Sequence, residues 1–494
     1  MELQSEGKGT NIKPENFTQD PAVVQCIRDL KNKFGENFEN LLVSDTLDEE
    51  GHQYVSIVQK GGGILGVALV GYTYILEQAG IRFLRLAGTS AGAINTALLV
   101  VIGKKQDAKS EKTLEYISGL NFFNFVDGHP FMRWLIKNFI KNKQFDKKIK
   151  QWFISIIIIL LALTAADFVF LGLRPYFPWA VWALRVAYIL TALHLALIAF
   201  IVIYSNRLSK SLREGGHGIN PGKYFYEWMK NVMEENGVSN VTQLNQKACT
   251  LPKLKVRNSL TQNANSLCGD VTFITSELSS QNKIEFPKMT NLFRENPDDL
   301  HPAHFVRASM SIPIFFDFHI IKDIPAESQK IKEAWLTHFG TDENIPCIAR
   351  FVDGGMMSNF PINMFYNPKI LEPRLPSFGI DLDDSDPKVK YVDPGQWGLG
   401  SYLGRLFNTI RYYYDKDFLI KNNVFKKGIG KIYLTEFNWL NFFISEEEKL
   451  KMFIRGAEAA RDFLLTFDWR KYQEERIQMQ IVLNEKNAPE EVKV

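Results

Sequence analysis

Residues 54–101 read YVSIVQKGGGILGVALVGYTYILEQAGIRFLRLAGTSAGAINTALLVV, and this stretch decides the fold. Its first residues, 54–59, predict a short buried strand, and residues 67–78 have the apolar spacing of a helix. A second strand is predicted at residues 82–87 and a second apolar helix at residues 93–101. A strand-helix-strand-helix run of this kind predicts a parallel sheet with helices packed on it, an α/β fold.

The turn between the second strand and its helix is Gly88-Thr89-Ser90-Ala91-Gly92, a G-x-S-x-G motif. In this motif the serine occupies a sharp strand-to-helix turn that exposes its Oγ, and the two glycines allow close packing. Ser90 would then lie at a helix N-terminus, where the dipole and the free N–H groups favour negative charge. A lone G-x-S-x-G also arises by chance, so a nucleophile needs further support.

A glycine-rich loop, Gly61-Gly62-Gly63-Ile64-Leu65-Gly66, precedes the first helix. Its N–H groups could point at a developing oxyanion, and preorganised donors of that kind contribute about 2.7 to 4 kcal/mol each. The same spacing occurs in Rossmann dinucleotide loops, which require an acidic residue about twenty positions on. The corresponding place reads RFLRLAGTS and has no acid, so the dinucleotide interpretation is disfavoured.

A nucleophilic serine needs a base, and the eight histidines all precede residue 350. The α/β-hydrolase order of serine, acid and histidine is therefore not fulfilled. The better candidate is Asp353 in FVDGGMMSNFP, where Gly354 and Gly355 would hold the carboxylate in a turn. A partly buried carboxylate can act directly as a base when its pKa is raised towards the working pH. Taken alone, Asp353-Gly354-Gly355 is equally compatible with an ordinary turn.

Together these three motifs resemble the patatin-like phospholipases, a family of serine lipid acyl hydrolases with a Ser-Asp dyad. The stretches VRASMSIPIFF (residues 306–316) and 271–278 are also similar to the family, and the likeness covers about residues 50–120 and 220–385. Lys60 departs from the pattern, because many relatives have aspartate before the glycines. Since the oxyanion donors are backbone groups, this change leaves the chemistry intact.

The resemblance implies a three-layer α/β sandwich around a mostly parallel central sheet, and a mechanism without metal or cofactor. Asp353 would take the proton from Ser90, whose Oγ attacks the ester carbonyl of a lipid. The implied oxyanion donors are the amides of Gly61, Gly62, Gly63 and Ala91, while the turns are shaped by Gly66, Gly88, Gly92, Gly354 and Gly355. An acyltransferase or thioesterase with the same dyad, and a non-catalytic membrane scaffold, remain as alternatives.

A very apolar block separates the predicted nucleophile from the predicted base. Residues 153–173 contain one charge, Asp167, and at about 1.5 Å per residue they would form a helix roughly 31 Å long, close to the thickness of a bilayer core. Residues 177–204 contain only Arg185 as a charge, and two prolines lie in the link between the stretches. We therefore expect an inserted hairpin of two transmembrane helices at residues 153–204. The alternative is a buried hairpin in the core of a soluble protein.

Basic residues at both ends of the block orient the predicted hairpin. The turn carries only Arg174, so the positive-inside rule places both ends, both termini and the catalytic domain in the cytoplasm. Asp167 and Arg185 should lie at similar depth, and we expect them to pair. The expected partners are the lipid bilayer and a membrane lipid substrate. The flanking basic residues are Arg133, Lys137, Lys141, Lys143, Lys147, Lys148, Lys150, Arg207, Lys210 and Arg213.

The composition excludes several other classes of protein. The 494 residues are 46% hydrophobic and 23% charged, which excludes a disordered chain, and the net charge of +3 does not suggest nucleic acid as a partner. The four cysteines form no C-x-x-C pair, which argues against a disulfide framework or zinc ribbon. The N-terminus has no apolar region typical of a secretory signal.

We expect three regions besides the hairpin: an N-terminal extension (1–49), the catalytic domain (50–385) and a C-terminal helical region (386–494). The acidic run Asp381, Asp383, Asp384 and Asp386 predicts a solvated loop after a strand at residues 377–380. The aromatic residues 437–443 (FNWLNFF) predict core packing, with contact to an acyl chain or a membrane as the alternative.

Overall fold

The computed structural model describes residues 12–141, 145–257, 267–383 and 415–487, together with residues 402, 406, 409 and 413. Several predicted features therefore lie outside the described residues: part of the N-terminal extension, the start of the C-terminal region, Lys143, Asp384 and Asp386. The chain divides into two units. The first comprises Met1–Val126, Gly222–Pro313 and Phe318–Val494, and the second comprises Asp127–Pro221 and Ile314–Asp317.

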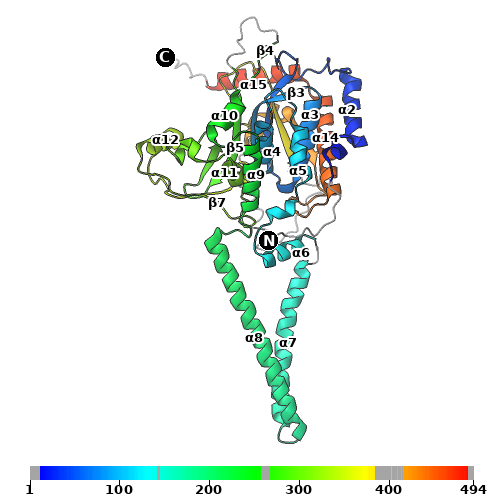
Figure 1. Ribbon diagram of the computed structural model, residues 1–494, viewed down its shortest axis with the longest axis vertical. Helices are drawn as coiled ribbons and strands as arrows, with labels where there is room; N and C mark the ends of the chain where they lie inside the picture. Colours follow the sequence, from blue (N-terminus) through cyan, green and yellow to red (C-terminus); the bar gives the residue numbers. More distant parts are fainter. Residues whose placement is uncertain are drawn as a thin grey trace. The chain divides into compact units, whose positions relative to one another are not determined.

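A ten-stranded mixed sheet forms the centre of the first unit (Figure 1). Strands β10, β9, β2, β3 and β5 lie side by side in that order and are parallel, and β8 and β7 continue the sheet in antiparallel orientation. The strands are β1 (Thr46–Leu47), β2 (Gln53–Gln59), β3 (Ile81–Thr89), β4 (Lys255–Val256), β5 (Asp270–Glu277), β6 (Asn282–Phe286), β7 (His319–Ile321), β8 (Ala349–Asp353), β9 (Ser377–Asp383) and β10 (Ile429–Tyr433).

The strands that carry the site are buried on both faces. Every residue of β2 is buried, as are all residues of β3 except Arg85. Strands covered on both sides are apolar throughout rather than alternating, which is why YVSIVQ and RFLRLA could be recognised as parallel strands. The predicted order of strand, helix, strand and helix is confirmed with nearly the predicted bounds.

Helices cover one face of the sheet, and residues 360–365 pack on the other. A Cβ on Gly430 of β10 would lie 2.0 Å from the Tyr72 hydroxyl of α3, so this face of β10 packs tightly against α3. The neighbouring Ile429 packs instead with Val58, Ala87, Phe360 and Ile362 on the opposite face. The predicted three-layer α/β fold is thereby confirmed. The helices of this unit are α1 (Pro14–Thr18), α2 (Pro21–Phe34), α3 (Gly66–Gln78), α4 (Ala91–Val101), α5 (Ser110–Ser118), α9 (Lys223–Glu235), α10 (Val241–Cys249), α11 (Ala303–Ser309), α12 (Gln329–Phe339), α14 (Glu446–Thr466) and α15 (Trp469–Asn487).

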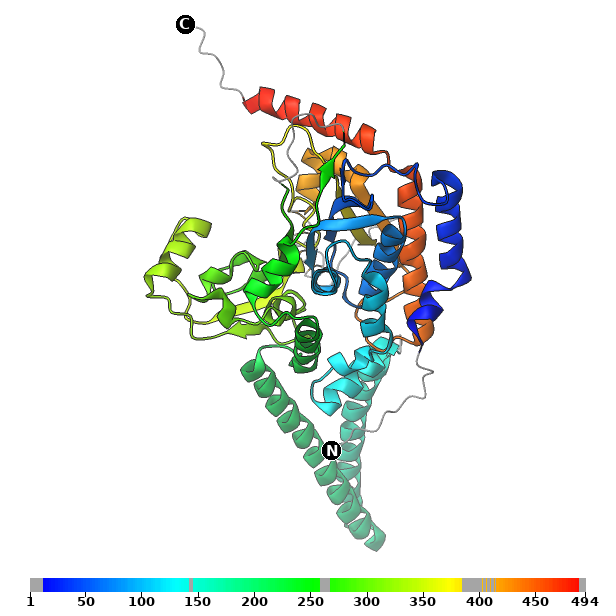
Figure 2. The same ribbon diagram turned by 45° about the horizontal axis from the view of Figure 1, so that its top comes forward.

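The C-terminal part of the chain is not purely helical, which corrects the expectation for residues 386–494. It supplies β10 to the central sheet, and α14 lies along α3 (Figure 2). The two helices approach closely, because a Cβ on Gly71 would lie 2.0 Å from the Phe453 carbonyl oxygen and one on Gly456 would lie 1.9 Å from that of Ala68. The end of the chain therefore belongs to the same sandwich as its beginning.

The second unit contains a long hairpin of α7 (Phe145–Leu173) and α8 (Pro178–Gly215), preceded by α6 (Pro130–Lys141). The two long helices lie side by side near their connecting turn and diverge towards their other ends (Figures 1 and 2). Each includes a segment long and apolar enough to cross a membrane, Gln151–Leu173 and Pro178–Arg207. Only 0% and 6% of these apolar stretches are buried, so the hairpin does not have the enclosed side chains of a soluble core.

The predicted pair between Asp167 and Arg185 is wrong. Thr191, further along α8, donates a hydrogen bond of 2.9 Å to Asp167, and the Arg185 guanidinium lies 5.1 Å from the ring centre of Trp182. Each charged side chain is therefore engaged by a closer neighbour on α8. Similar depth along two antiparallel helices does not ensure that two side chains face each other.

Candidate active site

Ser90 occupies the turn between β3 and α4, and its backbone has a conformation that is rare for a residue other than glycine. Its φ is 52° and its ψ is −118°, so the turn holds the serine under strain at the end of the strand. The flanking glycines make this turn possible. A Cβ on Gly88 would lie 2.3 Å from the backbone of Gly92, and a Cβ on Gly92 would lie 2.2 Å from the carbonyl oxygen of Gln59 in β2.

The glycine loop lies directly against the serine. A Cβ on Gly61 would be 3.1 Å from Cβ of Ser90, and one on Gly66 would be 3.0 Å from Cβ of Ala91. Within the described chain, no acceptor contacts the amides of Gly62 and Gly63. These two groups, and the amide of Ala91 in the first turn of α4, are therefore free to bind an anion beside Ser90.

Gly61 differs from the expectation that it is a donor. Its amide donates a hydrogen bond of 3.0 Å to the carbonyl oxygen of Asn359, and the Asn359 side chain donates to the Gly61 carbonyl at 3.3 Å. The amide of Ile64 is also engaged, with the Trp439 carbonyl at 3.0 Å. The loop is thus fixed at both sides of the two free amides, and Gly61 anchors it.

Asp353 ends strand β8, close to the end of β3. Thr89 is in register with Ile274 of β5, and Asp353 is in register with the next residue, Thr275. Because neighbouring strands lie about 4.8 Å apart, the backbones of Thr89 and Asp353 are about 10 Å apart across β5. Gly354 closes this distance, since a Cβ there would lie 3.0 Å from the Thr89 methyl group.

The Asp353 carboxylate is buried and held in a turn. Its Oδ1 accepts a hydrogen bond of 2.7 Å from the amide of Gly355, at the start of the short helix η6 (Gly354–Met356). Only 5% of Asp353 and 4% of Ser90 are exposed, so both groups are screened from bulk water. Residues that the sequence places far apart in the predicted domain therefore end two strands, β3 and β8, that lie on either side of β5.

The end of α11 ties the two residues together. The amide of Ser90 donates to Oγ of Ser309 at 2.9 Å, and that hydroxyl donates to the Ile274 carbonyl at 2.6 Å. Two residues on, the carbonyl of Ser311 accepts a hydrogen bond of 2.8 Å from the amide of Asp353. Both serines belong to the stretch VRASMSIPIFF, which gives that family-like segment a structural role.

A second support comes from the residues just after the Asp-Gly-Gly turn. Thr89 donates its hydroxyl to the carbonyl of Ser358 at 3.0 Å, and Asn359 holds Gly61 as described above. The buried carboxylate of Asp415 fixes this segment, because it accepts from the Ser358 hydroxyl at 2.8 Å and from the Phe360 amide at 2.8 Å. Burial raises the pKa of Asp415 to about 6, against the lowering effect of these hydrogen bonds.

Lys60 and Asp381 form a largely buried ion pair beside the glycine loop. Nζ of Lys60 donates to Oδ1 of Asp381 at 2.6 Å and to the carbonyl of Leu382 at 2.9 Å. The expectation of a solvated acidic loop is therefore wrong for Asp381 and Asp383, because β9 continues through both residues. Lys60, which departs from the family pattern, therefore compensates the negative charge of Asp381 in the extended strand β9.

An apolar pocket opens beside Ser90. Its accessible space is narrow, about 50 Å³, and aromatic side chains form much of its wall. Phe442, from the aromatic stretch 437–443, is one of them, so this stretch contributes to the pocket and not to core packing alone. Phe122 and Phe125, in the short helix η2 (Phe122–Phe125), form another part of the wall, together with Trp228, Ile94, Ile117, Met310 and Ile312.

Three comparisons relate the chain to known proteins. Residues 57–366 match the family described as patatin-like phospholipase. The chain is similar to the uncharacterized protein YqhO of Bacillus subtilis (strain 168), with 24% identity over 417 residues, which cover 83% of this chain and 98% of that protein. It is also similar to the solved structure of VipD from Legionella pneumophila, with 14% identity, a TM-score of 0.34, and coverage of 86% of this chain and 70% of that one.

Proposed function

The chain belongs to the patatin-like phospholipase family and is on that ground a lipid acyl hydrolase, and from this premise we propose that it cleaves acyl esters of membrane phospholipids through Ser90 and Asp353. Asp353 accepts the proton of the Ser90 hydroxyl, and Oγ attacks the ester carbonyl. An acyl-enzyme forms as the alcohol leaves, and water then releases the fatty acid. The chemistry requires only groups of the protein itself.

The observation that carries this proposal is the convergence of three separate motifs on Ser90. The strained turn places the serine in the wall of the apolar pocket, the turn after β8 holds the Asp353 carboxylate, and the amides of Gly62, Gly63 and Ala91 remain without acceptors in the described chain. Such amides stabilise the negative oxygen of a tetrahedral intermediate without any rearrangement when the charge develops.

Two further features favour a membrane lipid as the substrate. The pocket beside Ser90 is lined by apolar and aromatic side chains, which suits the first carbons of an acyl chain. The long hairpin of the second unit presents apolar side chains that are almost entirely unburied, as expected of helices surrounded by lipid. A tether of this kind holds the enzyme in the plane that contains its substrate, which raises the effective concentration of that substrate.

The test measures fatty acid release from phospholipid vesicles by the purified full-length chain. We expect Ser90→Ala and Asp353→Asn each to lower the rate by at least about 1,000-fold, as for other residues that act as one catalytic unit. A fluorophosphonate probe should label the wild type but not Ser90→Ala. The exposed Ser239 and the half-exposed Asp417 supply matched controls, and Ser239→Ala and Asp417→Asn should retain full activity.

Two outcomes would contradict the proposal. A wild-type chain that neither releases fatty acid nor reacts with the probe would indicate a non-catalytic scaffold. A chain that labels at Ser90 but passes the acyl group to an added alcohol in preference to water would be an acyltransferase.

A further inference from the structure

A second cavity lies among β3, residues 365–377 and α15, and the proposed acyl hydrolysis does not use it. It has an accessible volume of about 470 Å³ and is lined by three arginines, Arg85, Arg374 and Arg476. Glu372 is the only carboxylate among its described lining residues. The cavity therefore carries an excess of positive charge.

Arg476 is the most deeply buried of the three arginines. Only 5% of it is exposed, and its guanidinium carbon lies 4.9 Å from the ring centres of both Tyr366 and Phe425. These rings hold the flat guanidinium group in place. Its Nη1 is buried and has no hydrogen-bond acceptor among the residues that the structure describes.

Arg85, in the middle of β3, is held in a similar way by another aromatic ring. Its guanidinium carbon lies 5.4 Å from the ring centre of Phe365, and its buried Nε also has no acceptor in the described chain. Burial lowers the pKa of Arg85, but an arginine remains charged at any physiological pH. One buried and one partly buried cation thus line the same cavity, and each has a buried donor atom without an acceptor in the described chain.

This arrangement is costly unless an anion completes it. A buried N–H without an acceptor is destabilising, and the effect is larger when the group is charged. Proteins accept that cost where a ligand supplies the missing partner. A guanidinium group matches the oxygens of carboxylates and phosphates, and the lining carries three positive charges against one negative charge. A group with a charge close to −2, such as a phosphate monoester, would balance it.

We propose that this cavity is a binding site for a phosphate monoester group, held by Arg85 and Arg476. The ligand is either a free phosphate compound or the head group of a phosphate-bearing lipid, and both present the same oxygens. The cavity shares no described lining residue with the pocket beside Ser90, so its occupant is distinct from the ester that the enzyme cleaves.

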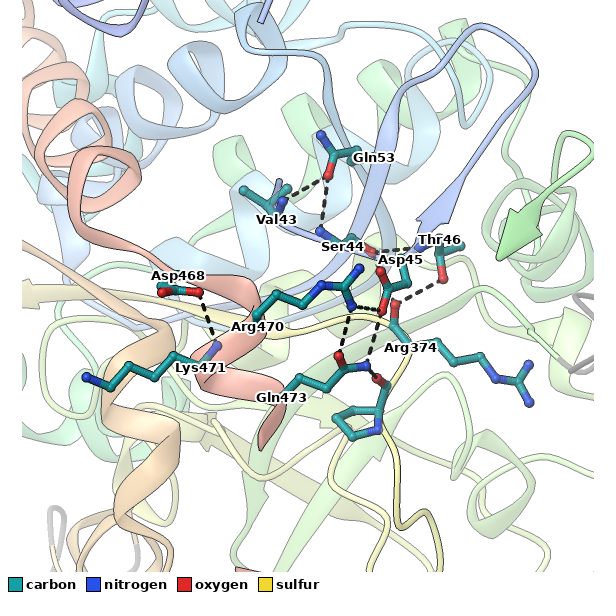
Figure 3. Close-up of polar contacts among 11 residues, drawn as sticks. Val43, Ser44, Asp45, Thr46, Gln53, Arg374, Asp468, Arg470, Lys471 and Gln473 are labelled. Carbon is teal, nitrogen blue, oxygen red and sulfur yellow. Dashed lines mark hydrogen bonds and ion pairs between the residues drawn. The ribbon is translucent and has the colours of Figure 1, made fainter. Parts of the chain in front are cut away.

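Hydrogen bonds of the chain itself hold the cavity wall in shape before any ligand arrives. The carbonyl of Arg374 accepts from the amide of Asp45 at 3.1 Å and from the hydroxyls of Ser44 and Thr46 at 3.4 Å each. From α15, the side-chain amide of Gln473 donates from Nε2 to the carbonyl of Pro373 at 2.9 Å and to Oδ2 of Asp45 at 3.1 Å (Figure 3). A preformed site loses little entropy when it binds its ligand.

The experiment measures the thermal unfolding of the full-length chain in detergent with millimolar ligand, at constant ionic strength set by chloride. The probes are inorganic phosphate, glycerol phosphate and dihexanoyl phosphatidic acid, with dihexanoyl glycerol as the uncharged control. We expect at least one phosphate probe to raise Tm by about 2 °C or more, and the uncharged control to have no effect. A response to all phosphate probes identifies a free phosphate compound, and a response to the lipid alone identifies a head group.

The variants Arg476→Met and Arg85→Met keep an unbranched side chain as far as the position of Nε and remove the charged guanidinium group. Each should abolish the rise in Tm, and neither should lower Tm in chloride by as much as an ordinary core substitution, because a buried donor without an acceptor is removed together with the guanidinium group. Lys471→Gln is the control, since this exposed lysine extends away from the contacts drawn in Figure 3. The proposal is overturned if no phosphate probe raises the wild-type Tm, or if both methionine variants respond as the wild type does. If one variant does not fold, the other decides.

Discussion

At the scale of single residues, the candidate site depends on the carboxylate of Asp415, which belongs to none of the three sequence motifs. Asp415 does not adjoin Ser90, yet it accepts hydrogen bonds from residues 358 and 360. The same segment accepts hydrogen bonds from Thr89 and from the amide of Gly61. A buried carboxylate by itself destabilises the folded chain. We attribute its presence here to the hydrogen bonds by which it fixes residues 358–360. It is a positioning residue for the site.

The raised pKa of Asp415 makes a prediction about stability. Its pKa is about 6 in the folded chain, against 3.8 for an ordinary aspartate, so the folded chain retains a proton that the unfolded chain has released at intermediate pH. The contribution of this group to stability is therefore fully present below about pH 3.8 and is lost as the pH rises through 6. The loss amounts to about 3 kcal/mol.

The Asp415→Asn variant cannot titrate at this position and should lack this component. Measured from pH 4 to pH 7, the Tm of the wild type relative to that of Asp415→Asn should fall as the pH rises. The Tm of the wild type relative to that of Asp417→Asn, which removes a half-exposed carboxylate two residues away, should stay constant over the same pH range. Parallel curves for the wild type and Asp415→Asn would contradict the assignment.

The sequence predicts the residues with strict backbone demands and misses those that support them. Ser90 and Asp353 lie beside glycines at which an added Cβ would come within 3 Å of another atom. Only glycine fits at these positions, so the sequence around both residues contains a recognisable motif. Asp415 and Asn359 act through side-chain hydrogen bonds to segments far away in sequence. Such contacts leave no local pattern, and only the fold reveals them.

At the scale of elements, the contact between α4 and β2 sets the position of the nucleophile. Adding a methyl group in Gly92→Ala would place a carbon about 2.2 Å from the Gln59 carbonyl oxygen, so the helix must move away from the strand. We expect a loss of about 1 to 3 kcal/mol in the free energy of unfolding, together with lower activity. Gly119→Ala is the matched control, because nothing lies within 4 Å of a Cβ there. Equal Tm values for the two variants would show that the contact is not tight.

The aromatic stretch before α14 makes a prediction about chain-length preference. Phe442→Ala removes a ring from the pocket wall and widens a narrow space, so the variant should favour long acyl chains over short ones. The ratio of kcat/KM for a sixteen-carbon ester to that for a four-carbon ester should rise by about 3- to 10-fold. Phe443→Ala is the control, because Phe443 packs on Phe123 and is not part of the described pocket wall. An unchanged ratio in Phe442→Ala would place the acyl chain elsewhere.

The sequence predicts helices and strands that have a clear apolar pattern. It does not predict those that form only because they pair with a strand from a distant part of the chain. The run from β2 to α4 is mostly apolar because its strands are enclosed on both faces, so its spacing identifies it even though Arg82 and Arg85 interrupt β3. Strand β10 contains Gly430 and Lys431 and, among the strands that the structure describes, pairs with β9 alone. Its pattern is too weak to be recognised in isolation. The extension of β9 through Asp381 depends on the ion pair with Lys60, which the sequence does not reveal.

At the scale of the whole molecule, the prediction of a membrane hairpin still needs a direct test. Leu161 and Leu197 lie in the apolar stretches of α7 and α8 and are 63% and 48% exposed, so their replacement removes no enclosed contact. Arginine at the centre of a membrane helix costs about 2.5 to 3.5 kcal/mol on insertion scales. The double variant Leu161→Arg and Leu197→Arg should therefore be extracted from membranes by alkaline carbonate, whereas the wild type should remain.

Leu336→Arg is the control for a general effect of added charge, because Leu336 is 55% exposed on α12 of the first unit. This variant should stay with the membrane fraction, as the wild type does. Extraction of the wild type itself, or retention of the double variant, would contradict the membrane assignment.

The order of the strands along the chain also has a consequence for biosynthesis. A ribosome makes β3 and its serine early, then the long apolar hairpin, and only much later β8 with its aspartate. Because β9 and β10 must still pair alongside β2, the sheet closes last. In the proposed mechanism, a nascent chain therefore carries the nucleophile before its base, and the enzyme stays latent until β8 has been made and the hairpin has already emerged.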